Sequence, residues 1–275
     1  MKMKLSVIPT GGLCNRMRAM ATGIAIAKHF QSQVVVYWNN DQGLKANFSD
    51  LFRKVSDDII IVENKKWLYN IRDTKSFILR WPLLCIKYKK IFYNYNVFSS
   101  KKKNVMSQIS NRDKNILLIS CHPMCEQIDV ASLFVPIDEI QFEIDKIVRH
   151  FNQRTIGVHI RRTDNNESIN KSPISAFENM IEKELGKDSN TQFYIASDDN
   201  RVKAFFKQKY PRNVIAFFED TSRNTYEGMR FAVVDLYCLS KTSYIIGSYY
   251  SSYSHIASVL GGIEVDYATN YQKNK

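Results

Sequence analysis

The chain has 275 residues, of which 44% are hydrophobic and 24% charged, enough for one large domain or two of about 130 residues each. No stretch approaches the roughly 20 apolar residues of a membrane-spanning helix. The apolar run at the N-terminus is broken by Pro9, Gly11 and Gly12 before it reaches signal-peptide length, and five scattered cysteines give no disulfide framework. We therefore expect a globular protein of the cytoplasm.

The first half begins with the pattern of a strand, a turn and a helix. The apolar run KLSVIP is followed by TGGLCN, after which Met17, Met20, Ala21 and Ile24 recur at helical spacing. Short β-branched and apolar runs predict further strands at 34–38, 59–62 and 116–120. This order predicts a Rossmann-like arrangement.

The turn at the start of this half is a candidate ligand-binding turn, because glycines allow a ligand to approach the backbone. Its candidate residues are Gly11, Gly12, Asn15 and Arg16. The alternative is an ordinary tight turn with surface arginines. The dinucleotide fingerprint G-x-G-x-x-G, the Walker lysine motif and the G-x-S-x-G elbow are all missing from the sequence.

A basic, aromatic segment follows at 65–103, and its secondary structure is not predicted by any clear pattern. With a formal net charge of +12, the chain is expected to meet an anionic partner. Basic groups on an apolar, aromatic body suit an anionic membrane surface, but a solvated basic face over buried aromatics explains the pattern as well. No RNA-binding signature accompanies the charge, so nucleic acid is not expected.

The second half shows strands and helices in regular alternation. A helix is predicted after Pro136, followed by strands at 155–160, 192–197, 213–218, 243–248 and 263–267, with helices beginning near Pro173, Asn200, Thr225 and Ser251. Alternating elements predict a parallel sheet covered on both faces. We predict an α/β protein with two Rossmann-like domains, residues 1–140 and 141–275, facing each other across a cleft at the carboxyl ends of their strands.

The stretch GVHIRRTDNNE places two arginines at the end of a predicted buried strand. Ile156, Val158 and Ile160 should point to one face, and Gly157, His159 and Arg161 to the other. Arg161 and Arg162 then lie where α/β sheets bind ligands, and guanidinium groups grip phosphate through paired hydrogen bonds. The alternative is a pair of salt bridges to Asp164 and to Asp198 or Asp199.

Three segments in the second half resemble the fucosyltransferase superfamily in the same order. HIRRTD (159–164) resembles the H-x-R-R-T-D motif of the α1,6-fucosyltransferases, and more loosely the arginine motif of the α1,2- and protein O-fucosyltransferases. The segments 193–211 and 233–262 are similar to the superfamily's later motifs. In the first half only GGLCNR (11–16) is similar, to the turn that opens many of these enzymes.

The resemblance implies a GT-B glycosyltransferase that transfers fucose from GDP-fucose with inversion and without a metal. It implies that Arg161 and Arg162 hold the GDP phosphates, oriented by Asp164 and Asp198, with Asp199 supporting the donor site. It further implies donor-site roles for His159, which would line the pocket, for Asp235 on the guanine side, and for Ser251 and Ser252, which would donate to phosphate. A helix start favours anions on physical grounds as well.

An inverting transfer needs a carboxylate to remove the proton of the acceptor hydroxyl. Glu167 is the candidate base, because apart from Asp164 it is the only acid in the loop after the arginines. The spacing between Glu167 and Pro173 departs from the family pattern, so an acid from the first half competes for this role. No metal is expected, because the arginines supply positive charge and Cys121, His122 and Cys125 lack a second ligand cluster.

Together these observations predict a fucosyltransferase acting on a free or lipid-linked glycan acceptor in bacterial-type surface polysaccharide synthesis, at the inner face of the cell membrane. One alternative is an inverting transferase for another nucleotide sugar, since arginines recognise the diphosphate. Another is a protein that binds anionic lipid or nucleic acid through the basic segment.

Overall fold

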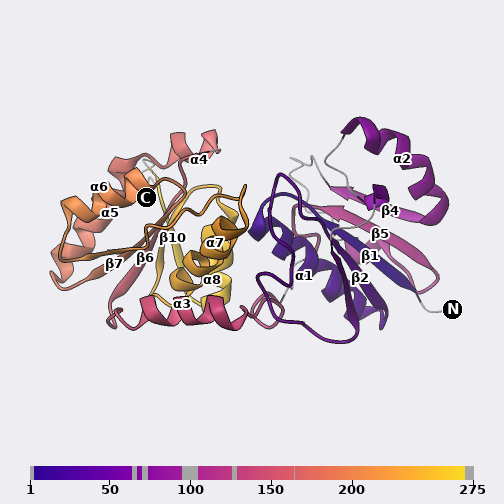
Figure 1. The fold of residues 1–275 in the computed structure, drawn as a ribbon, viewed down its shortest axis with the longest axis horizontal. Coiled ribbons are helices and arrows are strands. Elements are labelled where there is room, and N and C mark those ends of the chain that lie inside the picture. The colour runs from indigo at the N-terminus through magenta and orange to yellow at the C-terminus, as the bar shows by residue number, and fades with distance from the viewer. Residues whose placement is uncertain are drawn as a thin grey trace. The chain divides into compact units, whose positions relative to one another are not determined.

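The computed structural model of the chain describes residues 3–63, 67–69, 74–94, 105–125, 129–163 and 165–269, and Figure 1 shows its fold. The chain forms two compact units. Unit 1 comprises Met1–Val135 with Arg223–Thr225, and unit 2 comprises Pro136–Ser222 with Tyr226–Lys275. The expected division after residue 140 falls inside α3 (Asp138–Val148), which packs on α7 (Tyr226–Ser240) and so belongs wholly to unit 2.

Unit 1 contains a parallel five-stranded sheet in the order β3-β2-β1-β5-β4. Its elements are β1 (Lys4–Pro9), α1 (Leu13–His29), β2 (Gln33–Trp38), β3 (Ile59–Glu63), η1 (Trp67–Tyr69), α2 (Thr74–Lys87), β4 (Lys90–Asn94), η2 (Val105–Gln108) and β5 (Asn115–Ser120). The strands and the helix expected in this half are confirmed. The basic segment, which had no predicted structure, contributes α2 and β4 within its described part.

Unit 2 contains a second parallel sheet, in the order β10-β9-β6-β7-β8. Its elements after α3 are β6 (Thr155–Ile160), α4 (Asn166–Lys171), α5 (Ile174–Lys187), β7 (Gln192–Ser197), α6 (Asn200–Lys209), β8 (Val214–Ala216), α7, β9 (Ile245–Ser248), α8 (Ser252–Gly261) and β10 (Val265–Ala268). Figure 1 shows α5 and α6 to one side of this sheet and α7 and α8 to the other. The predicted alternation is confirmed, and the short helix α4 was not foreseen.

The central strand β6 is buried along its whole length, and its two faces meet different layers. Ile156, Val158 and Ile160 join the apolar cluster that includes Phe177 of α5 and Phe206 of α6. On the other face, a Cβ added to Gly157 would lie 2.8 Å from Thr242 Oγ1 and 3.0 Å from Leu239 Cδ2, so glycine allows the end of α7 to approach closely. The predicted alternation along this strand is therefore confirmed, and it fixes the direction in which the chain enters the following turn.

In the part of the chain that the structure describes, none of the helices combines the length and the apolar character needed to cross a membrane.

Candidate functional site

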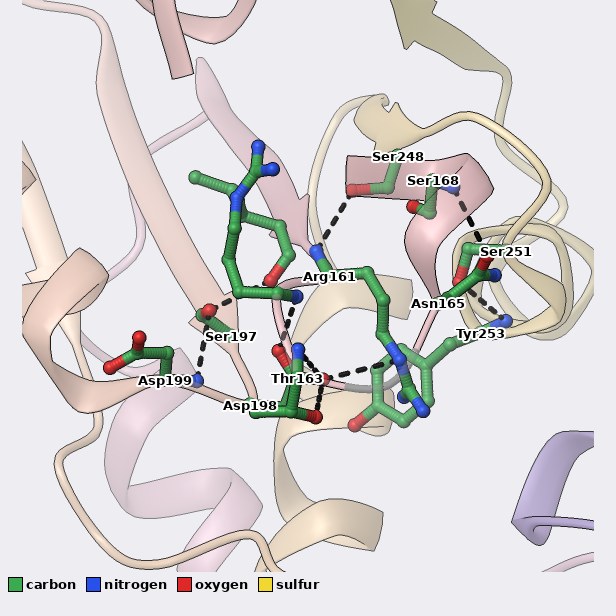
Figure 2. Close-up of polar contacts among 12 residues, drawn as sticks. Arg161, Thr163, Asn165, Ser168, Ser197, Asp198, Asp199, Ser248, Ser251 and Tyr253 are labelled. Carbon is green, nitrogen blue, oxygen red and sulfur yellow. Dashed lines mark hydrogen bonds and ion pairs between the residues drawn. The ribbon is translucent and has the colours of Figure 1, made fainter. Parts of the chain in front are cut away.

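The carboxyl ends of β6, β7 and β9 lie next to one another in the sheet of unit 2, and each is followed by polar residues. Figure 2 shows the side chains that gather there, from Arg161, Thr163 and Asn165 after β6, Asp198 and Asp199 after β7, and Ser251 and Tyr253 after β9. In open α/β sheets this edge is where ligands bind.

Two serines, one from each neighbouring strand, hold the end of β6. Ser197 Oγ of β7 donates to the carbonyl of Ile160 at 2.7 Å and accepts from the backbone N–H of Asp199 at 3.2 Å. Ser248 Oγ of β9 donates to the carbonyl of His159 at 3.1 Å and accepts from the N–H of Arg161 at 2.9 Å. The turn after β6 thus starts from a backbone position held from both sides.

The carboxylate of Asp198 organises the next residues of this turn. It accepts hydrogen bonds from the N–H of Arg162 at 2.7 Å, the N–H of Thr163 at 3.3 Å and the hydroxyl of Thr163 at 2.6 Å. The Nε of Arg161 lies 3.2 Å from the same carboxylate. Asp198 therefore fixes both the backbone of the turn and the direction of the Arg161 side chain (Figure 2).

The structure separates the two arginines. The Arg161 side chain is 27% exposed and lies at the edge of the sheet. The guanidinium of Arg162 donates to the carbonyls of Ile169, at 3.3 Å, and Ser172, and lies 5.9 Å over the ring of Phe177. Burial lowers the pKa of Arg162 below its usual value, against the opposing charge of Asp198. Arg162 thus ties α4 to the core, whereas Arg161 lies at the carboxyl edge of the sheet.

His159 lies beneath the site, not on its surface. Its Nδ1 is 2.7 Å from Ser254 Oγ, and its ring stacks on Tyr253 with centroids 4.7 Å apart. Burial, followed by the charge of Arg161, lowers the pKa of His159 to about 3, although Asp198 acts in the opposite direction. The imidazole is therefore neutral near pH 7 and serves to attach α8 to β6.

The N-terminus of α8 faces the same edge as Arg161. Ser251 is its N-cap and accepts a hydrogen bond from the N–H of Tyr253 at 3.3 Å, and Ser252 is its first residue. A Cβ on Gly247 would lie 2.7 Å from Ser254 Cβ, so a glycine in β9 lets the helix start close to the sheet. The partial positive charge of a helix N-terminus favours an anion here.

Tyr250 precedes this cap with a φ of 57°, a conformation in which a bulky residue is strained. Its carbonyl accepts a hydrogen bond from Asn165 Nδ2 at 3.3 Å, and Asn165 is itself the N-cap of α4. The loops after β6 and β9 are therefore joined. The sequence does not reveal this link or the roles of Ser197 and Ser248, because polar residues at strand ends carry no signal of their partners.

Asp199 and Asp235 each pair with a basic side chain of α6. Asp199 caps α6 and pairs with Arg201, whose guanidinium lies 2.8 Å away and lowers the pKa of Asp199. Asp235 is 2% exposed, accepts from the hydroxyl of Tyr194 and lies 3.4 Å from Lys203 Nζ. Burial raises the pKa of Asp235. The predicted guanine contact of Asp235 stays a prediction, and in this structure the carboxylate is turned into the interior.

Glu167 lies in the first turn of α4 and is exposed, with Lys171 Nζ 3.0 Å from its carboxylate. It is close in sequence to Arg162, which holds α4 in place. The other acid expected in this loop, Asp164, lies outside the described residues.

In unit 1, the glycine turn is held by a hydrogen bond from a buried arginine. Gly11 has a φ of +81°, and its carbonyl accepts from Arg16 Nε at 2.9 Å. Arg16 is fully buried, where it also bonds the carbonyl of Asn39 and the carboxylate of Asp41. Arg16 is thus neither a surface arginine nor placed to touch a ligand. Asn15 is half-buried beside Gly11 and Gly12, the N-cap of α1, and its Oδ1 accepts a hydrogen bond from the Arg18 guanidinium at 2.5 Å.

Within the described ranges, the structure brings together no group of three His, Cys, Asp or Glu side chains that would hold a metal ion.

No protein-family model matches the sequence, and no curated protein matches it at the sequence level. Solved structures do match. The chain superposes on NodZ α-1,6-fucosyltransferase soaked with GDP-fucose, with a TM-score of 0.63 and 15% identity over 94% of this chain and 93% of that one. The two parallel sheets and this structural match together identify the fold of the chain. This chain has the GT-B fold of the fucosyltransferases.

Two further fucosyltransferase structures share the fold. One is a mutant of Arabidopsis thaliana FUT1 in complex with GDP, with a TM-score of 0.63 and 13% identity over 99% of this chain and 71% of that one. The other is POFUT1 in complex with GDP, with a TM-score of 0.56 and 13% identity over 97% and 98% of the two chains. The predicted likeness to this superfamily is confirmed at the level of the fold.

The buried His159 predicts a specific dependence of stability on pH. Its pKa is about 3 in the folded protein and about 6.5 when unfolded. Between these values the unfolded state binds more protons, so the free energy of unfolding contributed by His159 falls by up to about 1.4 kcal/mol per pH unit as the pH drops below 6.5. Urea unfolding at pH 7.5, 6 and 5 should show a smaller fall for His159→Gln than for the unaltered protein.

His150 provides the control, because it is exposed. His150→Gln makes the same substitution outside the core and is measured beside His159→Gln. Equal slopes for His159→Gln and the unaltered protein would contradict this prediction, because they would mean that folding leaves the pKa of His159 unchanged.

Proposed function

We propose that this chain is an inverting fucosyltransferase that moves fucose from GDP-fucose to a hydroxyl group of a glycan. The observation that carries the proposal is the partly exposed Arg161 guanidinium, oriented by Asp198 at the ligand-binding edge of unit 2. The same fold occurs in a fucosyltransferase structure soaked with GDP-fucose and in others in complex with GDP. A cation held in this way suits a nucleoside diphosphate.

The diphosphate is proposed to lie between Arg161 and the N-terminus of α8. Arg161 offers a planar guanidinium, and the helix start offers backbone N–H groups together with the hydroxyls of Ser251 and Ser252. These groups stabilise the negative charge that develops on the β-phosphate as the sugar leaves. Because they are fixed in advance, they supply the charge that a divalent metal supplies in other transferases, and we propose transfer without a metal.

Arg162 and Asp198 are proposed to act by holding this geometry. Arg162 fixes α4 through the carbonyls of Ile169 and Ser172, and Asp198 fixes the turn that carries Arg161. His159 and Asp235 lie behind the surface and are assigned supporting roles, as is Asp199 at the start of α6. A direct phosphate contact is thus proposed for Arg161 and not for Arg162.

Glu167 is proposed as the general base. Its carboxylate takes the proton of the acceptor hydroxyl while that oxygen forms a bond to the anomeric carbon of fucose. The bond from the anomeric carbon to the β-phosphate oxygen breaks on the opposite face, and GDP departs with the electron pair. The position supports this role because α4 presents Glu167 to solvent near the arginine turn, and an acid from unit 1 is the competing candidate.

The acceptor is proposed to be a bacterial-type surface polysaccharide or oligosaccharide, free or lipid-linked, built in the cytoplasm. A second candidate activity uses another nucleotide sugar, because Arg161 recognises the diphosphate and not the sugar.

Replacing Arg161 by lysine tests the donor site. Arg161→Lys keeps the positive charge but loses the planar pair of N–H donors, so GDP affinity should fall by about 10- to 100-fold with the fold intact. Calorimetric titration with GDP, GDP-fucose and UDP-glucose in the presence of a chelator measures this. Arg154→Lys, at the opposite end of the same strand region, should bind GDP normally, and unchanged binding by Arg161→Lys would refute the phosphate role.

Replacing Glu167 by glutamine separates binding from chemistry. Glu167→Gln should leave GDP affinity unchanged and lower the rate of fucose transfer by about 100-fold or more, because the amide cannot accept the proton. The rate is followed as GDP release with an oligosaccharide that the unaltered protein fucosylates. Glu143→Gln, which removes another helical carboxylate paired with a lysine, serves as the control, and a small effect of Glu167→Gln would place the base elsewhere.

A further inference from the structure

Helix α2 is held on unit 1 by one of its faces. Arg80 and Leu84 are buried, as is Tyr88 just after the helix, at intervals of four residues. Arg80 donates to the carbonyl of Trp67 and lies 5.1 Å over its ring. The hydroxyl of Tyr88 donates to Ser6 Oγ of β1 at 3.0 Å. These contacts fix which side of α2 faces the protein.

The opposite face of α2 is apolar and exposed. Ile78, Leu79, Leu83 and Ile86 are 71%, 76%, 47% and 82% exposed, and Pro82 and Cys85 among them are exposed as well. Positions 79, 82, 83 and 86 share one side of a helix, so these side chains form one surface, called here the α2 apolar face. Soluble proteins rarely expose several large aliphatic side chains together without a partner, and their exposure costs free energy that burial would recover.

The stretch of sequence that carries this face has charged residues of a single sign. From Thr74 to Arg112 the sequence has nine Lys and Arg residues and no Asp or Glu. Among them, Lys89 is exposed just after α2, whereas Lys87, the last residue of the helix, donates from its Nζ to the hydroxyl of Tyr69 at 2.6 Å. An apolar helix face bordered by lysines is what binding in the interface of an anionic bilayer requires, with aliphatic groups entering the headgroup boundary and ammonium groups meeting lipid phosphates.

We propose that the α2 apolar face docks on an anionic lipid bilayer. Ile78, Leu79, Leu83 and Ile86 enter the boundary between headgroups and acyl chains, and the surrounding lysines bind the anionic headgroups. This inference does not depend on the donor site, and it goes beyond the proposed transfer by naming the surface at which a lipid-linked acceptor would be met.

Other partners fit the face less well. A second copy of the chain would bring two strongly basic segments together, and their repulsion opposes association. A nucleic acid would neutralise the lysines but leave the aliphatic side chains in water. A bilayer with anionic headgroups satisfies both the charge and the apolar surface.

Vesicle co-sedimentation tests the proposal with the full chain. The protein should bind vesicles of phosphatidylglycerol and phosphatidylcholine far better than vesicles of phosphatidylcholine alone. Leu79→Asp combined with Ile86→Asp should weaken binding to the anionic vesicles by about tenfold or more, since both side chains would carry charge into the interface. The variant should bind GDP as the unaltered protein does, so failure of this proposal is distinguishable from failure of the donor site.

A matched variant controls for added charge. Phe142→Asp combined with Phe205→Asp changes two hydrophobic residues of unit 2 that are 63% and 43% exposed, and it adds the same number of acids. This variant should bind anionic vesicles within about twofold of the unaltered protein. Equal loss in both variants would mean that net charge alone determines binding, and the α2 apolar face would be refuted as a docking surface.

Cys85 gives an independent readout, because it is the exposed one of the five cysteines. With Cys121 and Cys125 replaced by serine, a polarity-sensitive fluorophore on Cys85 should shift its emission to the blue on addition of anionic vesicles. No shift, together with no sedimentation, would overturn the proposal. A dimer in analytical ultracentrifugation that the Leu79→Asp, Ile86→Asp variant abolishes would also overturn it and assign the face to a second copy.

Discussion

The candidate site depends on the four contacts that the Asp198 carboxylate makes with the turn after β6. Three hydrogen bonds, from the N–H groups of Arg162 and Thr163 and the Thr163 hydroxyl, fix the backbone, and the ion pair with Arg161 fixes the side chain that faces the ligand edge. Hydrogen bonds to a charged group contribute about 1.5–3 kcal/mol each, so one carboxylate determines the geometry of the turn. Ser197 of β7 and Ser248 of β9 fix the end of β6 in the same way, through hydrogen bonds to its backbone.

Behind this surface, polar groups are paired in the interior. Lys203 is fully buried, donates to the carbonyl of Phe217 at 2.6 Å and faces Asp235 at 3.4 Å, and Tyr194 completes the set. Removing one partner of such a pair typically costs about 3–5 kcal/mol, because the remaining charge is left without compensation. The network joins β7, α6 and α7, so it fixes the strand after which Asp198 follows relative to its neighbouring helices.

The sequence predicted the architecture because the pattern of apolar strands and helices is local. Strand β6 follows the expected alternation, with Ile156, Val158 and Ile160 on one core face, and the HIRRTD motif carried the likeness to fucosyltransferases that the fold comparison confirms. Local sequence patterns do not predict which side chains of different elements contact one another. Arg162 turns inward because Ile169 of α4 and Ser172, the C-cap of α4, offer it two carbonyls. Helix α4 itself is too short to leave a periodic signal.

Burial of charged residues was the other feature that sequence patterns did not predict. Arg16 and Asp235 look like ligand-binding groups in the sequence, yet their partners Asn39, Asp41 and Lys203 come from distant segments. The exposed apolar side of α2 was not predicted either, because the basic, aromatic segment shows no clear helical pattern in the sequence. Only the packing of Arg80, Leu84 and Tyr88 shows which side faces water.

The central claim is that the edge formed by the ends of β6, β7 and β9 binds the donor diphosphate. Hydrogen–deuterium exchange of the full chain with and without saturating GDP-fucose tests it most directly. If the diphosphate binds at this edge, exchange should slow at 160–163, 197–201 and 248–254, with the largest change where the backbone N–H groups of α8 begin. Protection confined to other segments, or none at a concentration at which calorimetry shows binding, would contradict the account.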